Sequence, residues 1–458
     1  MTQSASPLRQ LARSAGSLAV LNLTSIALAF AVGVLLARGL GPSAYGVYGL
    51  SMTVATLAGM VTEFGLPVLT MREVAAARAN GRWDLARGLT IWGDRVVLGI
   101  SALLLGGLGA FWLIDRAAAA NSVFLATMLW AILLIPVVAL GKLRGLALLS
   151  LGHTVAGQLP VLLLRPGLFA LGLLALRFLG PPLSAPVAMI VQVAAAFVAM
   201  VTVRIAWQRL RPTEMRTAVP TFDRKGWIAA CLPMGMTEGL RLLQGQGAVL
   251  LLGILATTHD VGIYRVADAM SQMAGVGQTI LATAATPLLA RLHAGNDRHG
   301  LQGVLGATSI GMLLTTFLLG LPVLVLGPEL FGFVFGAKFV PSVPVFLIIW
   351  TGMLIFAVAG PAPTYANMTG RQNLTTASFV ISVLVNVAVA TVAIPRLGAI
   401  GAAVGVVSAN AVANSWLWWQ MYRRDGINTS AISRDALAML NPARLLATVR
   451  QWRGAKGN

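Results

Sequence analysis

Long apolar runs recur along the whole chain, separated by short stretches of polar and charged residues. A membrane-spanning helix needs about 20 mostly apolar residues. Twelve runs reach this length, and we predict transmembrane helices near residues 15–37, 44–68, 89–113, 121–141, 148–176, 183–203, 227–256, 262–290, 303–326, 341–366, 372–395 and 398–422. The pattern therefore predicts an all-α polytopic membrane protein.

Two short internal sequence repeats divide the twelve spans into two sets of six. Tyr45-Gly46-Val47-Tyr48 opens one apolar segment, and Val261-Gly262-Ile263-Tyr264 opens another 216 residues later. Phe178-Leu179-Gly180 and Arg396-Leu397-Gly398 repeat at almost the same offset. Matches at nearly constant spacing indicate a duplicated half-chain, as in many transporters. Because six is an even number of spans, both halves point the same way, which predicts a pseudo-twofold axis along the membrane normal.

The basic residues predict the orientation of these spans. With both termini in the cytoplasm, 24 of the 33 Lys and Arg residues fall on the inner side and three fall within spans. Only six lie outside: Arg38, Arg116, Arg177, Arg265, Lys338 and Arg396. The positive-inside rule fits this arrangement. We therefore predict an N-terminal lobe (1–205), a cytoplasmic linker (206–226), a C-terminal lobe (227–422) and a basic cytoplasmic tail (423–458).

The composition limits the class of protein, its partners and the metal sites that it can form. The chain is 57% hydrophobic and 10% charged, whereas a soluble domain carries about 25% charged residues. The net charge of +19 suits cytoplasmic membrane loops, and the absence of a basic-aromatic module argues against nucleic acid as a partner. Cys231 is the only cysteine, which excludes an intrachain disulfide and a Cys-based metal site. The four His residues are scattered, so we predict no metal site and no cofactor.

Three motifs, together with the span count, carry a family resemblance. They are Leu36-Ala37-Arg38-Gly39-Leu40-Gly41-Pro42-Ser43-Ala44-Tyr45-Gly46 between the first two spans, Phe335-Gly336-Ala337-Lys338-Phe339 before the tenth, and Leu397-Gly398-Ala399-Ile400-Gly401-Ala402-Ala403 entering the twelfth. On these residues the chain resembles the multidrug/oligosaccharidyl-lipid/polysaccharide (MOP) exporter superfamily over nearly its whole length. Within it, the chain is similar to the polysaccharide-biosynthesis flippases.

The resemblance implies a fold of two six-helix lobes and a function in cell-surface polysaccharide biosynthesis. The implied activity is translocation of an oligosaccharide linked to a lipid, usually undecaprenyl pyrophosphate, from the inner to the outer leaflet of a bacterial inner membrane. Alternating access between the lobes would carry it out, driven by the membrane potential or by H⁺ or Na⁺. The surrounding membrane lipids and a glycan polymerase or glycosyltransferase are the other implied partners. The motifs do not identify the sugar.

Charged residues inside the spans are the candidate site, because such groups usually face a cavity or a partner. Counted along the spans, Arg165 and Arg241 fall near the midplane, and Arg95 lies nearer the inner face. Pro160 and Pro166 flank Arg165 and predict a kinked helix beside a hydrated cavity. The candidate substrate-binding residues are Arg165, Arg241, Arg95, Glu238, Gln158 and Gln244, and the candidate ion-coupling residues are Glu238 and Asp268.

Structural roles compete with these assignments. Glu238 and Arg241 stand three residues apart, as do Arg265 and Asp268, so each pair has the spacing of an intrahelical ion pair. Glu63 is expected to pair with nearby Arg72.

Other functions also stay open. A multidrug or cation antiporter of the same fold is the first alternative, but it needs acidic groups, and the first span has none. A membrane glycosyltransferase or polymerase would need a large water-facing loop, which is absent, so we predict no enzyme.

Overall fold

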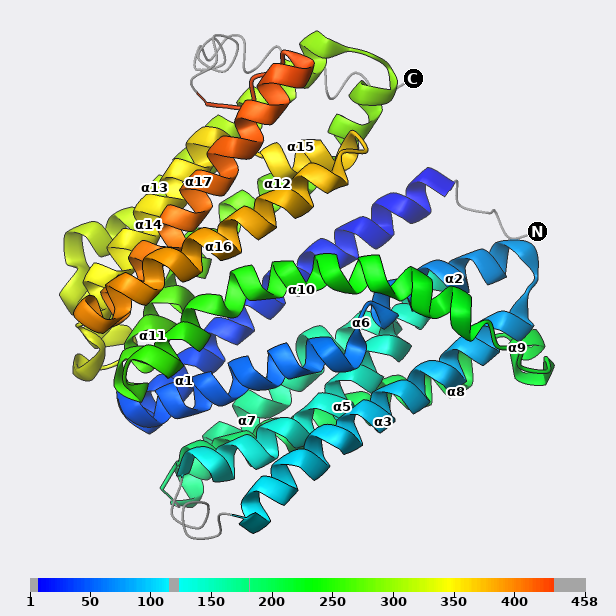
Figure 1. The fold of residues 1–458 in the computed structure, drawn as a ribbon, viewed down its shortest axis with the longest axis horizontal. Coiled ribbons are helices and arrows are strands. Elements are labelled where there is room, and N and C mark those ends of the chain that lie inside the picture. The colour runs from blue at the N-terminus through cyan, green and yellow to red at the C-terminus, as the bar shows by residue number, and fades with distance from the viewer. Residues whose placement is uncertain (1–6, 115–122, 181, 432–458) are drawn as a thin grey trace. The chain divides into compact units, whose positions relative to one another are not determined.

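The computed structural model describes residues 7–114, 123–180 and 182–431, and the regular structure within these ranges is helical throughout (Figure 1). Nine of the described helices are long and apolar enough to cross a membrane, or ten if α11 and α12 form one bent span. Helix α1 (Pro7–Glu63) contains two predicted spans. Helix α10 (Arg224–Leu255) covers the seventh predicted span without being among the nine. The chain is therefore an all-α polytopic membrane protein, as its sequence predicts.

The sharp turn inside α1 separates the first two predicted spans. Gly41 has φ 73° and ψ 173°, and Pro42 follows it. A Cβ built on Gly33 would lie 3.8 Å from the Tyr45 hydroxyl, whereas a straight helix places residues 12 apart about 18 Å from each other. The chain therefore doubles back at Gly41, where glycine is the residue that tolerates a positive φ.

Internal packing divides the chain into two units, 1–246 and 247–458, with the boundary inside α10. The first 23 residues of α10 (224–246) thus belong to the first unit. The lobe limits predicted from topology, 1–205 and 227–422, remain a prediction. The structure describes the chain only as far as Ala431, so most of the predicted tail lies outside the described residues.

The first unit is organised around α5 (Val123–Ser150), which packs against α1, α2 (Leu66–Asn80), α3 (Trp83–Ile114) and α8 (Ala185–Leu210). The sequence predicts that the fourth span ends near residue 141, but α5 continues to Ser150, and this extension carries the half-exposed Lys142 and the buried Arg144. Arg144 forms an ion pair with Asp94 of α3, and its guanidinium lies 5.5 Å from the centre of the Trp207 ring. The ion pair allows this buried cation to stay charged.

The fifth predicted span is built from α6 (Thr154–Leu159), the π-helix η1 (Pro160–Leu164) and α7 (Arg165–Leu179). The π turn begins at Pro160, and the Arg165 N–H donates to the Pro160 carbonyl five residues back. Single π turns are rare and frequently mark functional sites. The irregular helix predicted around Arg165 is therefore present.

The linker between α8 and α10 is fixed to the first unit. It contains α9 (Thr213–Thr217), and Met215 packs in a core with Val74, Ala147 and Trp207. Thr221 donates its hydroxyl hydrogen to Asp84 Oδ2 (2.7 Å) and its N–H to the Asp84 carbonyl (3.2 Å). The linker therefore follows a defined path over the start of α3.

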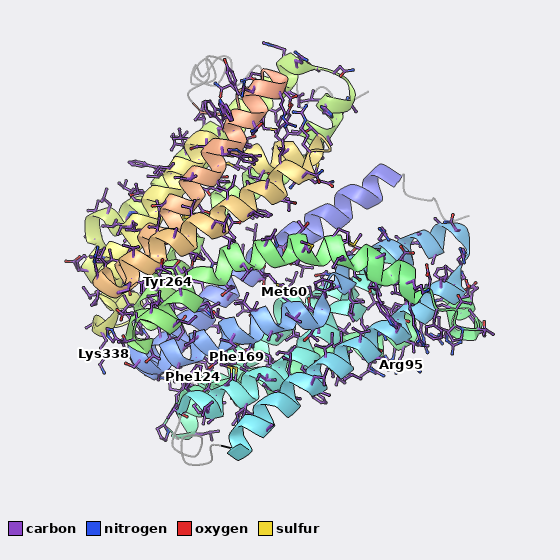
Figure 2. All side chains as sticks on the ribbon, in the orientation of Figure 1. Met60, Arg95, Phe124, Phe169, Tyr264 and Lys338 are labelled. Carbon is purple, nitrogen blue, oxygen red and sulfur yellow. The ribbon has the colours of Figure 1, made fainter. Side chains whose placement is uncertain are left out.

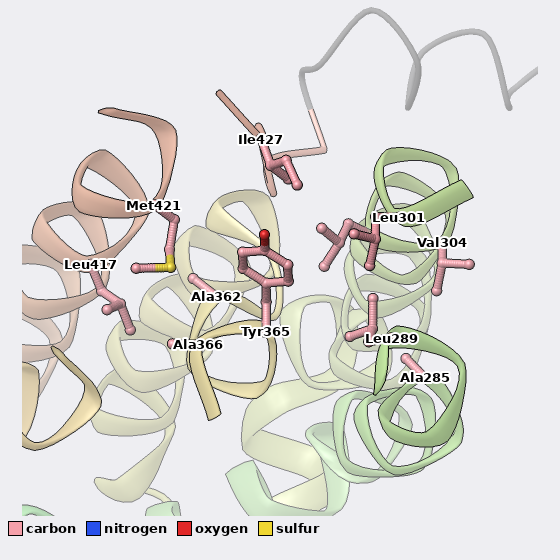
Figure 3. Packing of buried hydrophobic residues seen from close by; sticks show 11 residues of the cluster. Ala285, Leu289, Leu301, Val304, Ala362, Tyr365, Ala366, Leu417, Met421 and Ile427 are labelled. Carbon is pink, nitrogen blue, oxygen red and sulfur yellow. The ribbon is translucent and has the colours of Figure 1, made fainter. Parts of the chain in front are cut away.

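The second unit contains α11 (Thr258–Ala274), α12 (Val276–Ala294), α13 (Arg298–Val334), α14 (Ser342–Ala359), α15 (Ala362–Met368), α16 (Gln372–Leu397) and α17 (Ala399–Asp425). Helices α11 and α12 meet at 47°. A core cluster of the second unit lies around Tyr365 of α15, between Leu301 of α13 and Met421 of α17 (Figure 3).

The segment after α17 turns back into the second unit and occupies the break between α14 and α15. Gly360 and Pro361 interrupt the helix there, which leaves carbonyl groups without helical partners. Thr429 donates its hydroxyl hydrogen to the Ala359 carbonyl (2.8 Å), and the Ala431 N–H donates to the Val358 carbonyl (2.9 Å). The segment at 427–431 therefore satisfies part of the broken backbone.

Candidate substrate cavity

A cavity of about 250 Å³ lies within the first unit, between the second half of α1, α5, α7 and the first part of α10. Its apolar wall is formed by Met52, Met60, Leu134, Ile135, Val138 and Leu242. Five charged residues also line it: Glu63, Lys142, Arg165, Glu238 and Arg241. Three cations and two anions give the lining a net charge of +1.

Close packing of α10 on α1 brings the acids and cations of these two helices together. A Cβ on Gly239 would lie 2.6 Å from the terminal methyl of Met60, and a Cβ on Gly235 would lie 3.1 Å from Phe64. At Gly235 the neighbouring atoms include the Phe64 backbone, so the close approach there needs glycine; at Gly239 the neighbour is the end of the flexible Met60 side chain. As a result, one cavity contains residues of the second, fourth, fifth and seventh predicted spans.

Four of the five charges are paired. The Lys142 ammonium lies 2.6 Å from a Glu63 oxygen, across 79 residues of sequence. Arg241 donates from Nε and Nη2 to both oxygens of Glu238, at 2.9 and 2.6 Å. The Glu238–Arg241 spacing thus does form the predicted intrahelical ion pair. Both carboxylates of the cavity therefore have a cation beside them.

Arg165 is the exception. No carboxylate in the described part of the chain forms an ion pair with it. One turn further along α7, the ring of Phe169 stacks on Tyr48 with centroids 6.3 Å apart, which fixes this part of α7 against α1. An arginine guanidinium stays charged at any physiological pH. A buried cation without a counter-ion in its own chain attracts anions.

The other predicted residues lie elsewhere. Arg95 is exposed on α3, because its neighbour Asp94 faces Arg144 and adjacent residues point in different directions around a helix (Figure 2 labels Arg95 and the cavity residue Met60). Gln158 and Gln244 are half-buried outside the cavity lining. Asp268 belongs to the second unit, where its carboxylate accepts a hydrogen bond from Gln272 (3.1 Å).

Sequence reasoning gave Glu63 the wrong partner. Arg72, the expected partner, binds the adjacent Glu73 at 2.8 Å. The chain bends between Glu63 and α2, where Phe64 and Gly65 have φ of 26° and 77°, so Arg72 does not continue the α1 face that carries Glu63. Lys142 lies just beyond the predicted end of the fourth span, and only the unbroken α5 places it one turn after Val138, on the face that lines the cavity.

Solved structures with a similar fold are transporters. A multidrug resistance MATE family transporter of the MOP superfamily in an inward-facing conformation is 15% identical, with a TM-score of 0.71 over 88% of this chain and 98% of that chain. The lipid II flippase MurJ in an inward closed conformation is 12% identical, with a TM-score of 0.68 over 88% and 86%. A MOP superfamily transporter from Pyrococcus furiosus is 15% identical, with a TM-score of 0.57 over 90% and 95%. The helices and the cavity thus define a membrane protein with the twelve-helix fold of MOP transporters.

The family is shown directly by sequence. Residues 11–293 match the family described as polysaccharide biosynthesis protein, and the chain belongs to that family. No curated protein matches the chain.

Proposed function

We propose that this protein is a flippase that moves a lipid-linked oligosaccharide, of the undecaprenyl-pyrophosphate type, from the inner to the outer leaflet by alternating access. Membership of the polysaccharide biosynthesis family supports the substrate class. The single observation that carries the proposal is the position of Arg165, unpaired by any described carboxylate, in a cavity with a net positive lining. A pyrophosphate is an anion whose oxygens match the two parallel N–H groups of a guanidinium.

Arg165 holds the pyrophosphate in this proposal. The Glu238–Arg241 pair forms part of the cavity wall, where Nε and Nη2 of Arg241 bind Glu238. The alternative, a cation antiporter, would need a carboxylate that is open to a cationic substrate. Both acids of this cavity are instead paired with Lys or Arg, which favours an anionic substrate.

Complementation of a deletion strain tests the site. A hydrogen bond to a charged group contributes about 1.5–3 kcal/mol, so Arg165→Gln is expected to weaken binding roughly ten- to a hundredfold and to abolish export at normal expression. Arg165→Lys should restore it only in part, because the bidentate fork is lost. Arg177→Gln, at the exposed end of the same helix, is the matched control and should export normally.

The substrate is identified in the deletion strain itself. Loss of the protein should leave lipid-linked glycan in the inner leaflet and deplete the surface polymer. Unchanged surface glycan together with reduced drug or dye efflux would favour the antiporter instead.

We also propose that the protein lies in the inner membrane with both termini in the cytoplasm, because basic residues are in excess on that side. Reporter fusions after Arg82 and within the 206–226 linker should read cytoplasmic, and a fusion near His259 should read external. An external signal from the linker would overturn this orientation. H⁺ or Na⁺ as the coupling ion, and a polymerase or glycosyltransferase as a neighbour, are proposed from the family alone.

A further inference from the structure

Three arginines meet where the linker docks on the first unit. They are Arg87 on α3, Arg211 at the end of α8 and Arg216 on α9. Arg87 Nη1 donates to the carbonyls of Arg216 and Ala218, both at 2.6 Å. Arg216 Nη2 donates to the carbonyls of Gln208 (2.6 Å) and Arg209 (3.0 Å), just before Arg211. The three cations are therefore held next to one another by the backbone of the linker.

No described carboxylate forms an ion pair with these three arginines. None of the ion pairs formed by described residues includes Arg87, Arg211 or Arg216. The Nε of Arg211 is buried and has no hydrogen-bond partner there. Burial lowers the pKa of Arg211, and the positive charges of Arg216 and Arg87 lower it further. A buried donor on a charged group is costly when unpaired, so the cluster has the character of an incomplete anion site.

Apolar side chains on the same linker point to the source of the anion. Val219 is 78% exposed and Phe222 is 40% exposed, both within a few residues of Arg216. The Arg224 guanidinium lies 5.7 Å from the centre of the Phe222 ring. Exposed apolar side chains flanked by cations, here Arg216 before them and Arg224 and Lys225 after them, are typical of a segment at a membrane interface, where the apolar groups enter the acyl boundary. A free phosphate in solution would give no reason for Val219 and Phe222 to be exposed.

We propose that Arg211, together with Arg87 and Arg216, binds the phosphate of an anionic phospholipid headgroup, while Val219 and Phe222 contact the upper part of its acyl chains. Basic pockets next to the cytoplasmic ends of membrane helices suit such headgroups. The site is separate from the substrate cavity. It anchors the linker to the bilayer surface at the point where the linker is also fixed to α3.

Lipid retention measures the site directly. The full-length protein is purified in a neutral detergent, supplied with phosphatidylglycerol or phosphatidylcholine, and bound lipid is counted by native mass spectrometry. The wild type should retain phosphatidylglycerol in preference. Arg211→Gln should reduce this retention about tenfold, which corresponds to one lost charge-assisted hydrogen bond. Arg211→Lys should lie between the two because it keeps the charge without the fork.

Two controls separate this site from general charge effects. Arg177→Gln removes the same charge from the exposed end of α7 and should retain phosphatidylglycerol as the wild type does. Phe222→Ser leaves all three arginines in place and should also weaken retention. Because this side chain is 40% exposed, the variant tests the site even if Arg211→Gln fails to fold.

Inorganic phosphate and glycerol phosphate, added at millimolar concentration, distinguish the sources of the anion. Neither should displace the lipid. If either one does so, or if phosphatidylcholine is retained as well as phosphatidylglycerol, the lipid proposal is wrong. Equal retention by wild type, Arg211→Gln and Phe222→Ser would overturn it as well. None of these outcomes bears on glycan export, which depends on the cavity around Arg165.

Discussion

Removing either member of the Glu63–Lys142 pair should cost different amounts of stability, because the two side chains differ in exposure. The Glu63 side chain is 15% exposed and that of Lys142 is 38% exposed. Removing one partner of a fully buried pair costs about 3–5 kcal/mol. This pair borders a cavity that water can enter, so we expect about 2–3 kcal/mol for Lys142→Met, which leaves the more buried carboxylate uncompensated. Glu63→Gln leaves the more exposed ammonium and should cost about 1 kcal/mol.

The difference is large enough to measure by thermal unfolding in detergent. For a unit of this size a change of 1 kcal/mol moves Tm by about 2–4 °C, so Lys142→Met should lower Tm by about 4–12 °C and Glu63→Gln by about 2–4 °C. Trp92 and Trp227, with ring centroids 5.3 Å apart in the adjoining core, supply the fluorescence signal. Met keeps the length of the lysine stem and Gln keeps the shape of glutamate, so packing changes little.

The double change Glu63→Gln with Lys142→Met completes the cycle. It removes both charges, so it should lie closer to wild type than Lys142→Met alone does. Two results would refute the reasoning: a double variant as unstable as Lys142→Met, or a Glu63→Gln variant that loses more stability than Lys142→Met. Either would mean that the carboxylate is stabilised by another group, and that the pair does not control the charge of the cavity.

Two more predictions concern the other ion pair and the segment after α17. Arg241 binds Glu238 through Nε and Nη2, so Arg241→Gln alone should impair export because it leaves an uncompensated acid in the cavity. The double change Glu238→Gln with Arg241→Gln should restore export. If export stays impaired in the double variant, Arg241 contacts the substrate. Asn428 accepts hydrogen bonds from Trp418 Nε1 (2.9 Å) and the Ser430 N–H (3.0 Å). Asn428→Ala should therefore lower the free energy of unfolding by about 1–3 kcal/mol. An unchanged Tm would show that the segment at 427–431 does not stabilise the break between α14 and α15.

The sequence by itself determined the class of protein and the positions of most of its helices along the chain. Apolar runs of sufficient length placed the helices, because a backbone in lipid must satisfy its own hydrogen bonds and a helix does so locally. The turn at Gly41 and Pro42 falls between the first two predicted spans, and the spacing of Glu238 and Arg241 predicted their ion pair. Pro160 and Pro166 indicated the irregular helix at Arg165. All of these are local signals, readable within one or two turns of chain.

Only the tertiary structure decided which charges meet. The ion pair of Glu63 and Lys142 spans 79 residues, and that of Asp94 and Arg144 spans 50. Proximity in sequence favoured Arg72 as the partner of Glu63, but the bend at Gly65 takes Arg72 off the helix face that carries Glu63. The linker, read as a polar connection, is fixed over α3 by Arg87 and Thr221. Periodicity shows that a helix will span a membrane. Its rotation and its neighbours depend on small residues such as Gly235 of α10, where the backbone of Phe64 comes close.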